Sequence, residues 1–432
     1  MNIEDLYQVY LEHPSVQTDT RKLKEGDLFF ALKGPNFNAN SFATQALEQG
    51  AAGAVIDDPS FHISGKTILV DNVLEALQQL AKHHRLQFTI PFIAITGSNG
   101  KTTTKELVSA VLSTKYRTYT TEGNLNNHIG IPLTILRVKP DAEMAVIEMG
   151  ANHQREIAGY CEYTLPTHGI ITNCGKAHLE GFGGVEGVRK GKGELYDFIR
   201  QTQGAAFVMW DYEYLREMSK GIPEIITYGS HDASITGLVK QSEPYLEVSV
   251  ANVPGLTQMK SQLVGEYNLP NILVAVTVGR HFNIEGTAIQ AAIESYAPSN
   301  SRSQLIVSGS NRIILDAYNA NPSSMRLAIE NIAALTALSK LVLLGAMAEL
   351  GEDSLDEHQA IINLLSQHSW TAVVLVGGDF MKIPHPYLSF ETAILAGEWF
   401  RQQNFTDTTI LIKGSRSMQM EKVLEQPVPG HE

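Results

Sequence analysis

The stretch Ile95-Thr96-Gly97-Ser98-Asn99-Gly100-Lys101-Thr102-Thr103-Thr104-Lys105 decides the fold of the centre of this chain. It follows an apolar run at 91–95, which predicts a strand, and it precedes a helical pattern of apolar side chains within 107–112. Glycines let backbone N–H groups approach phosphate oxygens, and the start of a helix adds partial positive charge. The stretch therefore predicts a nucleoside triphosphate site, where Lys101 reaches the outer phosphates and the Thr102 hydroxyl binds Mg²⁺.

This loop is a shortened form of the usual phosphate-binding pattern, because Ile95 stands where the first glycine is expected. The competing interpretation is an ordinary glycine-rich turn with an exposed lysine. The strand before the loop and the helix after it favour the phosphate site.

The composition narrows the class of protein. A length of 432 residues predicts two to four domains, and 43% hydrophobic with 18% charged residues is typical of a globular protein. The net charge of −13 argues against a nucleic-acid or anionic-membrane partner. The acidic start lacks a signal-peptide pattern, and no apolar run reaches the roughly 18 residues of a membrane helix, so we expect a cytoplasmic protein. Cys161 and Cys174 form no metal or redox spacing, and we expect both to be buried small side chains.

Residues 1–84 predict a small N-terminal α/β domain. Its expected strands are 28–32, 54–56 and 67–70, and its expected helices are 41–49 and 73–86.

Residues 85–297 predict a central domain of the phosphate-loop type with a mostly parallel sheet. Apolar strands are expected at 145–147, 169–171 and 205–208, with helical stretches between them. Between 234 and 264 apolar residues alternate with polar ones, which predicts antiparallel hairpins at the edge of the sheet.

Residues 298–432 predict a C-terminal Rossmann-like domain after the linker Pro298-Ser299-Asn300-Ser301. Strand patterns at 313–315, 341–344, 372–376 and 409–412 alternate there with helical patterns. The expected fold class is therefore α/β with three domains.

Polar residues follow the central strands where a parallel sheet places its ligands. Glu148 ends the run at 145–147 and suits a Mg²⁺ ion that bridges phosphates, although a solvated strand-end acid is the alternative. His178 follows the next strand in a glycine-rich loop and is either structural or a ligand. Lys190 and Lys192 form either a solvated basic patch or a phosphate clamp. The amide-rich block at 124–132 positions a substrate or serves only as turn chemistry.

Taken together, these segments resemble the Mur ligases, the ATP-dependent amide ligases of peptidoglycan precursor synthesis. The resemblance covers essentially the whole chain and rests on 19–21, 26–34, the phosphate loop, 124–132, 147–151, 177–179, 192–194, 316–325, 344–351, His358 and 413–416. The phosphate loop alone marks a wider superfamily that includes folylpolyglutamate synthase. The segments 316–322 and 347–351 narrow it to ligases that join D-alanyl-D-alanine to UDP-MurNAc-tripeptide.

The resemblance implies a set of site residues. Expected ATP-binding residues are Thr96, Gly97, Ser98, Asn99, Gly100, Lys101, Thr102, Thr103, Asn268, Asn271, Arg302, Asp316, Tyr318 and Asn319. Expected substrate-binding residues are Thr20, Arg21, Lys33, Gly34, Asn124, Asn126 and Asn127. Expected catalytic residues are Lys101, Glu148, His178 and Lys192.

Two Mg²⁺ ions are implied as well, the first on Thr102 and Glu148 and the second on His178 and Lys192. Lys192 takes that part if CO₂ carbamylates it, which turns a cation into a carboxylate-like anion. The chain departs from many relatives at Tyr267, where they have histidine, and at Ala346, where they have an acid.

The implied reaction starts when the tripeptide carboxylate attacks the γ-phosphate of ATP, and the amine of D-alanyl-D-alanine then attacks the acyl phosphate. We expect a monomer that needs no protein nucleophile. The alternatives are another ligase of the superfamily, either an amino-acid-adding Mur ligase or folylpolyglutamate synthase, and a nucleotide-gated binding protein without net chemistry.

Overall fold

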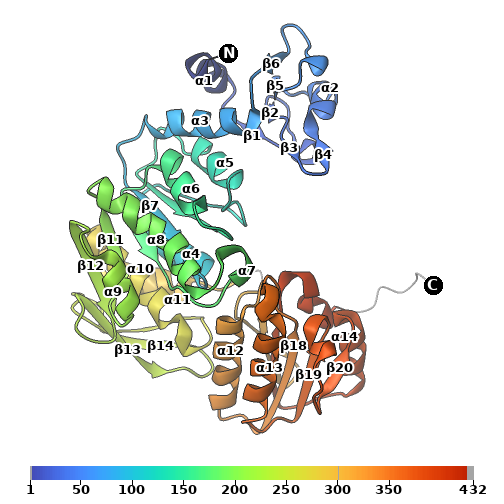
Figure 1. Cartoon of the computed structure of the whole chain (residues 1–432). Coiled ribbons are helices and arrows are strands. Elements are labelled where there is room, and N and C mark those ends of the chain that lie inside the picture. Colours follow the sequence, from blue (N-terminus) through green and yellow to red (C-terminus); the bar gives the residue numbers. More distant parts are fainter. Residues whose placement is uncertain (1, 300, 426–432) are drawn as a thin grey trace.

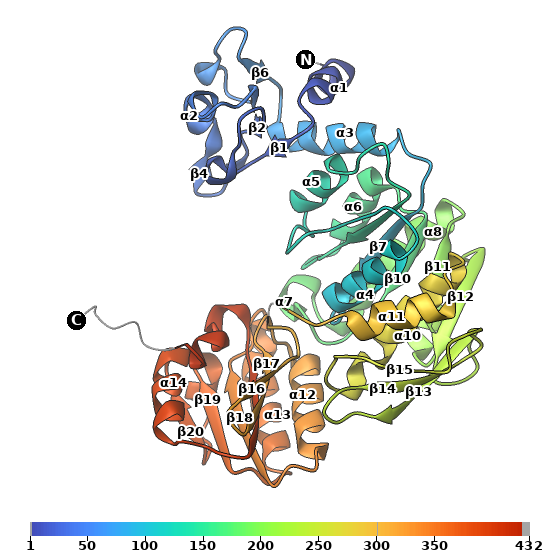
Figure 2. The same cartoon turned by 180° about the vertical axis from the view of Figure 1, so that it is seen from behind.

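The computed structural model describes residues 2–299 and 301–425. Three α/β parts follow one another, with the N-terminal part at one end, the phosphate-loop part in the middle and the C-terminal part at the other end (Figure 1). The same order is seen from behind in Figure 2. The three-domain α/β architecture expected from the sequence is confirmed.

The N-terminal part is built on a parallel sheet in the order β1-β2-β5-β6. These strands are β1 (Val16–Gln17), β2 (Leu28–Phe30), β5 (Gly53–Ile56) and β6 (Thr67–Leu69). A short hairpin of β3 (Lys33–Gly34) and β4 (Phe37–Asn38) precedes α2 (Ala43–Glu48). β2 and β5 are buried throughout, which explains their continuous apolar runs.

Two further N-terminal helices are α1 (Ile3–Glu12) and α3 (Val73–Arg85); α1 packs on α3, which faces the central part. The Asn72 side chain caps α3, and Leu77 and Leu80 on its apolar face are fully buried in the same cluster as the central core. α3 lies beside α5 (Gly130–Leu136) and α6 (Glu156–Thr164) in both views.

The central part has a nine-stranded sheet in the order β15-β14-β13-β12-β11-β10-β7-β9-β8. Pairing is parallel from β8 to β13 and antiparallel in the last two pairs, so the predicted edge hairpins are confirmed. Its strands are β7 (Phe92–Thr96), β8 (Thr118–Thr120), β9 (Met144–Glu148), β10 (His168–Ile171), β11 (Ala205–Met209), β12 (Glu224–Gly229), β13 (Ile235–Gln241), β14 (Glu247–Ala251) and β15 (Gln258–Lys260).

Helices cover both faces of this sheet. Besides α5 and α6, they are α4 (Lys101–Ser113), α7 (Leu179–Phe182), α8 (Val185–Gln201), α9 (Glu213–Ser219), α10 (Leu269–His281) and α11 (Gly286–Ser295).

The C-terminal part has a six-stranded sheet in the order β16-β17-β21-β18-β19-β20, with only β16 antiparallel to its neighbour. The strands are β16 (Gln304–Ser308), β17 (Asn311–Asp316), β18 (Ser339–Gly345), β19 (Ala372–Val376), β20 (Leu388–Phe390) and β21 (Thr408–Lys413). The helices are α12 (Pro322–Ala334), α13 (Ser354–Leu365) and α14 (Ala393–Gln402). Successive side chains of β18 enter two different apolar clusters, so both faces of the sheet are covered.

Short 3₁₀ turns complete the described chain. They are η1 (Thr20–Lys22), η2 (Ala39–Phe42), η3 (Pro59–Phe61), η4 (Glu266–Asn268), η5 (Gly351–Asp353), η6 (Gly378–Lys382), η7 (Arg416–Met418) and η8 (Met420–Val423). Across 2–299 and 301–425, none of the helices has both the length and the apolar character needed to cross a membrane.

Candidate active site

A cavity of about 770 Å³ lies between the central and C-terminal parts, where β7, β9 and β10 end. The carboxyl ends of parallel strands are where ligands bind in such sheets. The sequence-predicted residues that line it are Ser98, Asn99, Gly100, Lys101, Thr102, Thr103, Asn126, Asn127, Glu148, His178, Asn268, Asn271, Arg302, Asp316, Tyr318 and Asn319. Two separately folded parts thus bring most of the predicted site together.

The phosphate loop requires glycine at two positions. A Cβ on Gly97, which has a φ of +144°, would lie 1.9 Å from Thr172 Oγ1, and Gly100 has a φ of +78° directly before α4. Lys101 Nζ donates to the Gly97 carbonyl at 2.8 Å, and its burial lowers the pKa of the ammonium. Thr96 lies beneath the loop, where its buried hydroxyl donates to the Met149 carbonyl at 2.8 Å.

Glu148 is held on both carboxylate oxygens. The Thr102 hydroxyl donates to Oε2 at 2.9 Å, and the Asn126 side-chain amide donates to Oε1 at 2.8 Å. The Glu148 side chain is buried, with 1% of its surface exposed. The structure therefore places Asn126, which the sequence suggested for substrate binding, directly on the acid at the end of β9.

His178 directly precedes α7, and Lys192 lies in α8, the next helix along the chain. His178 has a φ of +52° and lines the cavity, and its Nδ1 contacts the Glu349 carboxylate. This contact holds the pKa of Glu349 below its usual range. Lys192 is fully buried, and its Nζ donates at 2.9 Å to the carbonyl of Ala151, which lines the cavity. Burial, followed by the charge of Lys101, lowers the pKa of Lys192 to about 7.

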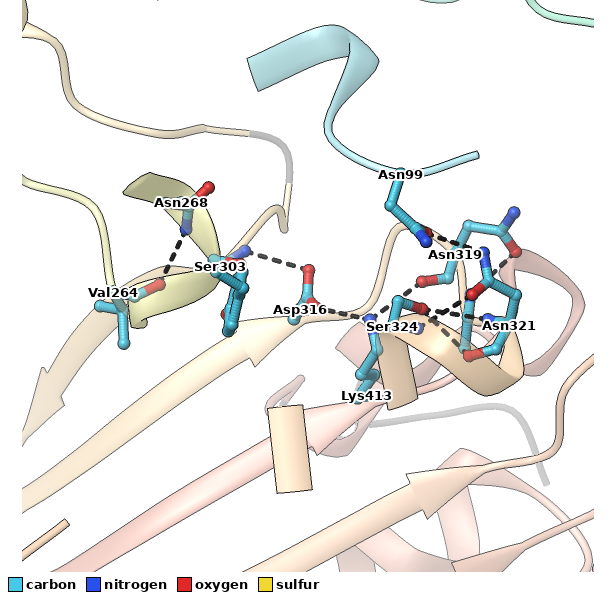
Figure 3. A network of polar contacts seen from close by, with 11 residues as sticks. Asn99, Val264, Asn268, Ser303, Asp316, Asn319, Asn321, Ser324 and Lys413 are labelled. Atoms are coloured by element: carbon cyan, nitrogen blue, oxygen red, sulfur yellow. Dashed lines mark hydrogen bonds and ion pairs between the residues drawn. The ribbon is translucent and has the colours of Figure 1, made fainter. Parts of the chain in front are cut away.

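The side-chain amides near the predicted adenine position are tied to one another. Asn271 Nδ2 donates to Asn268 Oδ1 at 2.8 Å. Asn268 Nδ2 in turn donates to the Val264 carbonyl at 2.9 Å (Figure 3). Thr104 Oγ1 donates to Asn271 Oδ1 at 3.0 Å. Tyr267, the departure from many relatives, hydrogen-bonds Ser303 of the C-terminal part through its hydroxyl.

The C-terminal wall of the cavity is organised by Asp316 and Lys413 (Figure 3). The Lys413 ammonium, 1% exposed, lies 2.5 Å from Asp316 Oδ2 and 3.2 Å from the Asn319 carbonyl. The Arg302 guanidinium stacks 3.4 Å from the centre of the Tyr318 ring. Lys413 belongs to the segment 413–416 that carries the resemblance, but no role was predicted for it; its position at the end of the apolar strand β21 is the signal that points to the site.

Direct bonds join the two walls. Asn321 Nδ2 donates to Asn99 Oδ1 at 2.7 Å, and the Lys176 backbone N–H donates to the Ser323 hydroxyl at 2.9 Å. The Lys176 ammonium also forms an ion pair with Glu357. No spacing in the sequence pairs these residues, because they are 147 or more positions apart.

The other predicted residues lie away from this cavity. Thr20 and Arg21 are in η1 of the N-terminal part, where the exposed Arg21 pairs with Asp19. Lys33 and Gly34 form β3, and Lys33 pairs with Asp57 at 2.9 Å. Asn124, Thr96, Gly97 and Lys192 do not line the cavity within the described chain. Cys161 and Cys174 are buried free thiols, as expected.

Comparison with known proteins identifies the family to which a chain with this arrangement belongs. A family model described as the Mur ligase middle domain matches residues 95–279, and one described as the Mur ligase, glutamate ligase domain matches 301–416. The UDP-N-acetylmuramoyl-tripeptide--D-alanyl-D-alanine ligase of Escherichia coli strain K12 is 35% identical, over 95% of this chain and 92% of that protein.

Solved structures agree along the whole length. A crystal structure of MurF from Acinetobacter baumannii is similar with a TM-score of 0.87 at 28% identity, covering 98% of this chain and 97% of that one. MurF from Thermotoga maritima in complex with ADP is similar with a TM-score of 0.86 at 25% identity, covering 96% and 97%.

The chain therefore belongs to the Mur ligase family, a class of ATP-dependent, ADP-forming ligases. Within that class its place is with the UDP-N-acetylmuramoyl-tripeptide--D-alanyl-D-alanine ligases, the MurF branch.

Proposed function

We propose that this protein joins D-alanyl-D-alanine to UDP-MurNAc-tripeptide, using ATP and giving UDP-MurNAc-pentapeptide, ADP and phosphate. The observation that carries the proposal is the cavity, which combines the phosphate loop and Glu148 with Asp316 and Tyr318 of the next domain. Relatives that carry this activity in their names match the chain almost from end to end.

The reaction has two steps. A carboxylate oxygen of the tripeptide attacks the γ-phosphorus of ATP, the bond to the β,γ-bridging oxygen breaks, and ADP leaves. The dipeptide amine then attacks the acyl carbon, loses a proton, and displaces phosphate. Lys101 and the N–H groups at the start of α4 stabilise charge on the transferred phosphoryl group. The walls of the cavity keep water from the acyl phosphate. The linker at 298–301, of which residue 300 lies outside the described chain, is proposed as the hinge that lets them close.

Thr102 and Glu148 fit a Mg²⁺ ion. They supply a hydroxyl and a carboxylate 2.9 Å apart beside the phosphate loop, and Mg²⁺ prefers one or two such oxygens together with phosphates and water. Held by these two residues, such an ion would supply charge neutralisation between the carboxylate and the triphosphate.

Lys192 fits a carbamate. The pKa of about 7 leaves much of the amine neutral near physiological pH, and only a neutral amine adds CO₂. The product anion, together with His178, would supply the ligands of a second Mg²⁺ ion. An unmodified ammonium at this position would repel the ion instead.

The N-terminal part anchors the UDP end of the substrate, far from the cavity. Thr20, Arg21, Lys33 and Gly34 supply hydroxyl, cationic and backbone donors there. Asn124 and Asn127 hold the substrate nearer the centre.

We further propose that the enzyme is a monomer of the cytoplasm without a nucleic-acid partner. Its three domains are proposed to span residues 1–84, 85–297 and 298–432.

The test is release of phosphate from ATP by the purified protein. UDP-MurNAc-tripeptide with D-alanyl-D-alanine should stimulate release strongly, and omission of either should abolish it. A single amino acid in place of the dipeptide should not substitute. Stimulation by a single amino acid or by a folate would favour another ligase of the superfamily. ATP binding without any substrate-dependent release would favour a binding protein.

A further inference from the structure

The loop that follows β18 belongs to the C-terminal domain and contacts the central domain. Glu349 has a φ of +61°, an uncommon conformation for a residue other than glycine, and its carbonyl faces the Glu180 backbone N–H at 3.5 Å. At Gly351 a Cβ would lie 3.1 Å from Glu180 Cβ, so this loop lies directly against α7. The position of the Glu349 Cα atom is thus fixed by the contact of this loop with α7.

That side chain ends on His178. The Nδ1 atom of His178 is buried, makes an ion-pair contact with the Glu349 carboxylate, and has no other polar partner in the described chain. A carboxylate only accepts hydrogen bonds, so a neutral His178 ring that bonds to Glu349 carries its proton on Nδ1. Nε2 of that tautomer keeps its lone pair, and His178 lines the cavity.

We propose that Glu349 is a positioning residue, which holds His178 in the Nδ1–H tautomer and leaves the Nε2 lone pair for a cation in the cavity. Carboxylates commonly orient metal-binding histidines in this way. This inference rests on the proposed function. Because Glu349 belongs to the C-terminal domain, docking of that domain and preparation of His178 become one event.

A second contact of the same kind provides a control. Glu357 pairs with Lys176, two residues before His178, and also crosses between the domains. Glu357→Gln should therefore remove one ion pair between the same two domains and leave the contacts of the His178 imidazole unchanged. Glu349→Gln keeps an acceptor oxygen for Nδ1–H, whereas Glu349→Leu keeps the approximate size and removes the acceptor.

The experiment combines two readouts on full-length protein. Long-range ¹H–¹⁵N correlation spectra of histidine-labelled enzyme report the tautomer, with the His178 signal assigned from its loss in His178→Gln. Titration with Mn²⁺ in the presence of ADP, followed by electron paramagnetic resonance, reports cation binding. We expect the Nδ1–H tautomer in the wild type, Glu349→Gln and Glu357→Gln. Glu349→Leu should show a tautomer mixture, about tenfold weaker Mn²⁺ binding and a lower kcat.

Two outcomes would overturn the proposal. One is a wild-type His178 that is the Nε2–H tautomer or stays an imidazolium above pH 8. The other is an equal loss of Mn²⁺ binding in Glu357→Gln and Glu349→Leu, which would leave docking as the sole role. The spectra do not depend on which substrate is ligated, so failure of the proposed reaction alone would leave the tautomer result standing.

Discussion

The central domain holds its two neighbours by opposite means. Toward the N-terminus, the contact surface formed by α1 and α3 with α5 and α6, here called the N-terminal seam, is buried and largely apolar. The Arg85 guanidinium, 5% exposed, donates to the carbonyls of Thr164 and Leu165, both at 2.9 Å, and lies 3.9 Å from the centre of the Phe92 ring. His84 Nε2 donates to the Val138 carbonyl at 2.8 Å.

Toward the C-terminus polar side chains from both domains add to the apolar contact, since the same buried cluster continues to Met347 and Leu350. This C-terminal seam consists of the pairs Lys176–Glu357, His178–Glu349, Asn99–Asn321, Tyr267–Ser303 and Glu243–Thr336. Half of the Lys176 and Glu349 side chains is exposed, and exposed ion pairs contribute only about 0–1 kcal/mol each.

The difference has a functional consequence. We propose that the N-terminal domain, which holds the UDP end, stays fixed, and that the polar pairs let the C-terminal domain undock. On this proposal, substrate is held in one place while the reacting end of the site opens for ATP and product.

Lys101 belongs to neither seam, and its substitution should have the largest effect on activity. Lys101→Ala removes the cation of the phosphate loop, and we expect ADP formation to fall by at least about 1,000-fold. The melting temperature and the scattering profile should stay those of the wild type. Retained turnover in a coupled ADP assay would refute the role of the loop in ATP use.

A substitution of Lys192, like that of Lys101, is expected to change the chemistry of the site without changing the contacts between the domains. We expect Lys192→Ala to lose at least about 100-fold in activity, with partial recovery when short carboxylic acids replace the missing anion. Recovery with added amines would instead indicate a cationic role. Because the neutral amine adds CO₂, the CO₂-dependent activity of the wild type should rise as the pH increases through about 7.

The sequence predicted what depends on local pattern. The strand–loop–helix at 92–113, the strand-end position of Glu148 and the change from parallel to antiparallel pairing all follow from residues close in the chain. It did not predict β16 or β20, which are edge strands, nor the contacts Asn126–Glu148, Lys413–Asp316 and Glu349–His178. Those contacts depend on how separate elements pack against one another, and the spacing of residues along the sequence does not reveal that packing.

The N-terminal seam predicts a large effect on stability. Arg85→Ala leaves buried carbonyls of residues 88, 164 and 165 without their donor and opens space against Phe92, which should lower stability by about 3 kcal/mol and the melting temperature by roughly 5 °C. Lys82→Ala, exposed on the same helix, is the control and should change neither. An unchanged melting temperature in Arg85→Ala would remove the contrast between the seams.

The C-terminal seam predicts the smallest effect on stability but a visible effect on shape. The Glu243 carboxylate accepts from the Thr336 hydroxyl at 2.7 Å and lies 3.7 Å from Arg312, and the Thr336 bond holds its pKa below the usual range. Glu243→Ala should change stability by less than about 1 kcal/mol.

Small-angle scattering is the measurement that separates the two seams. Without ligands, Glu243→Ala should have a larger radius of gyration than the wild type, and salt should enlarge the wild type in the same direction by screening the polar pairs. An ATP analogue with UDP-MurNAc-tripeptide should compact both proteins. Lys240→Ala, exposed on the same hairpin, should behave as wild type. If neither salt nor Glu243→Ala alters the profile while ligands also leave it unchanged, the C-terminal domain is as fixed as the N-terminal one, and the polar seam is not a device for opening.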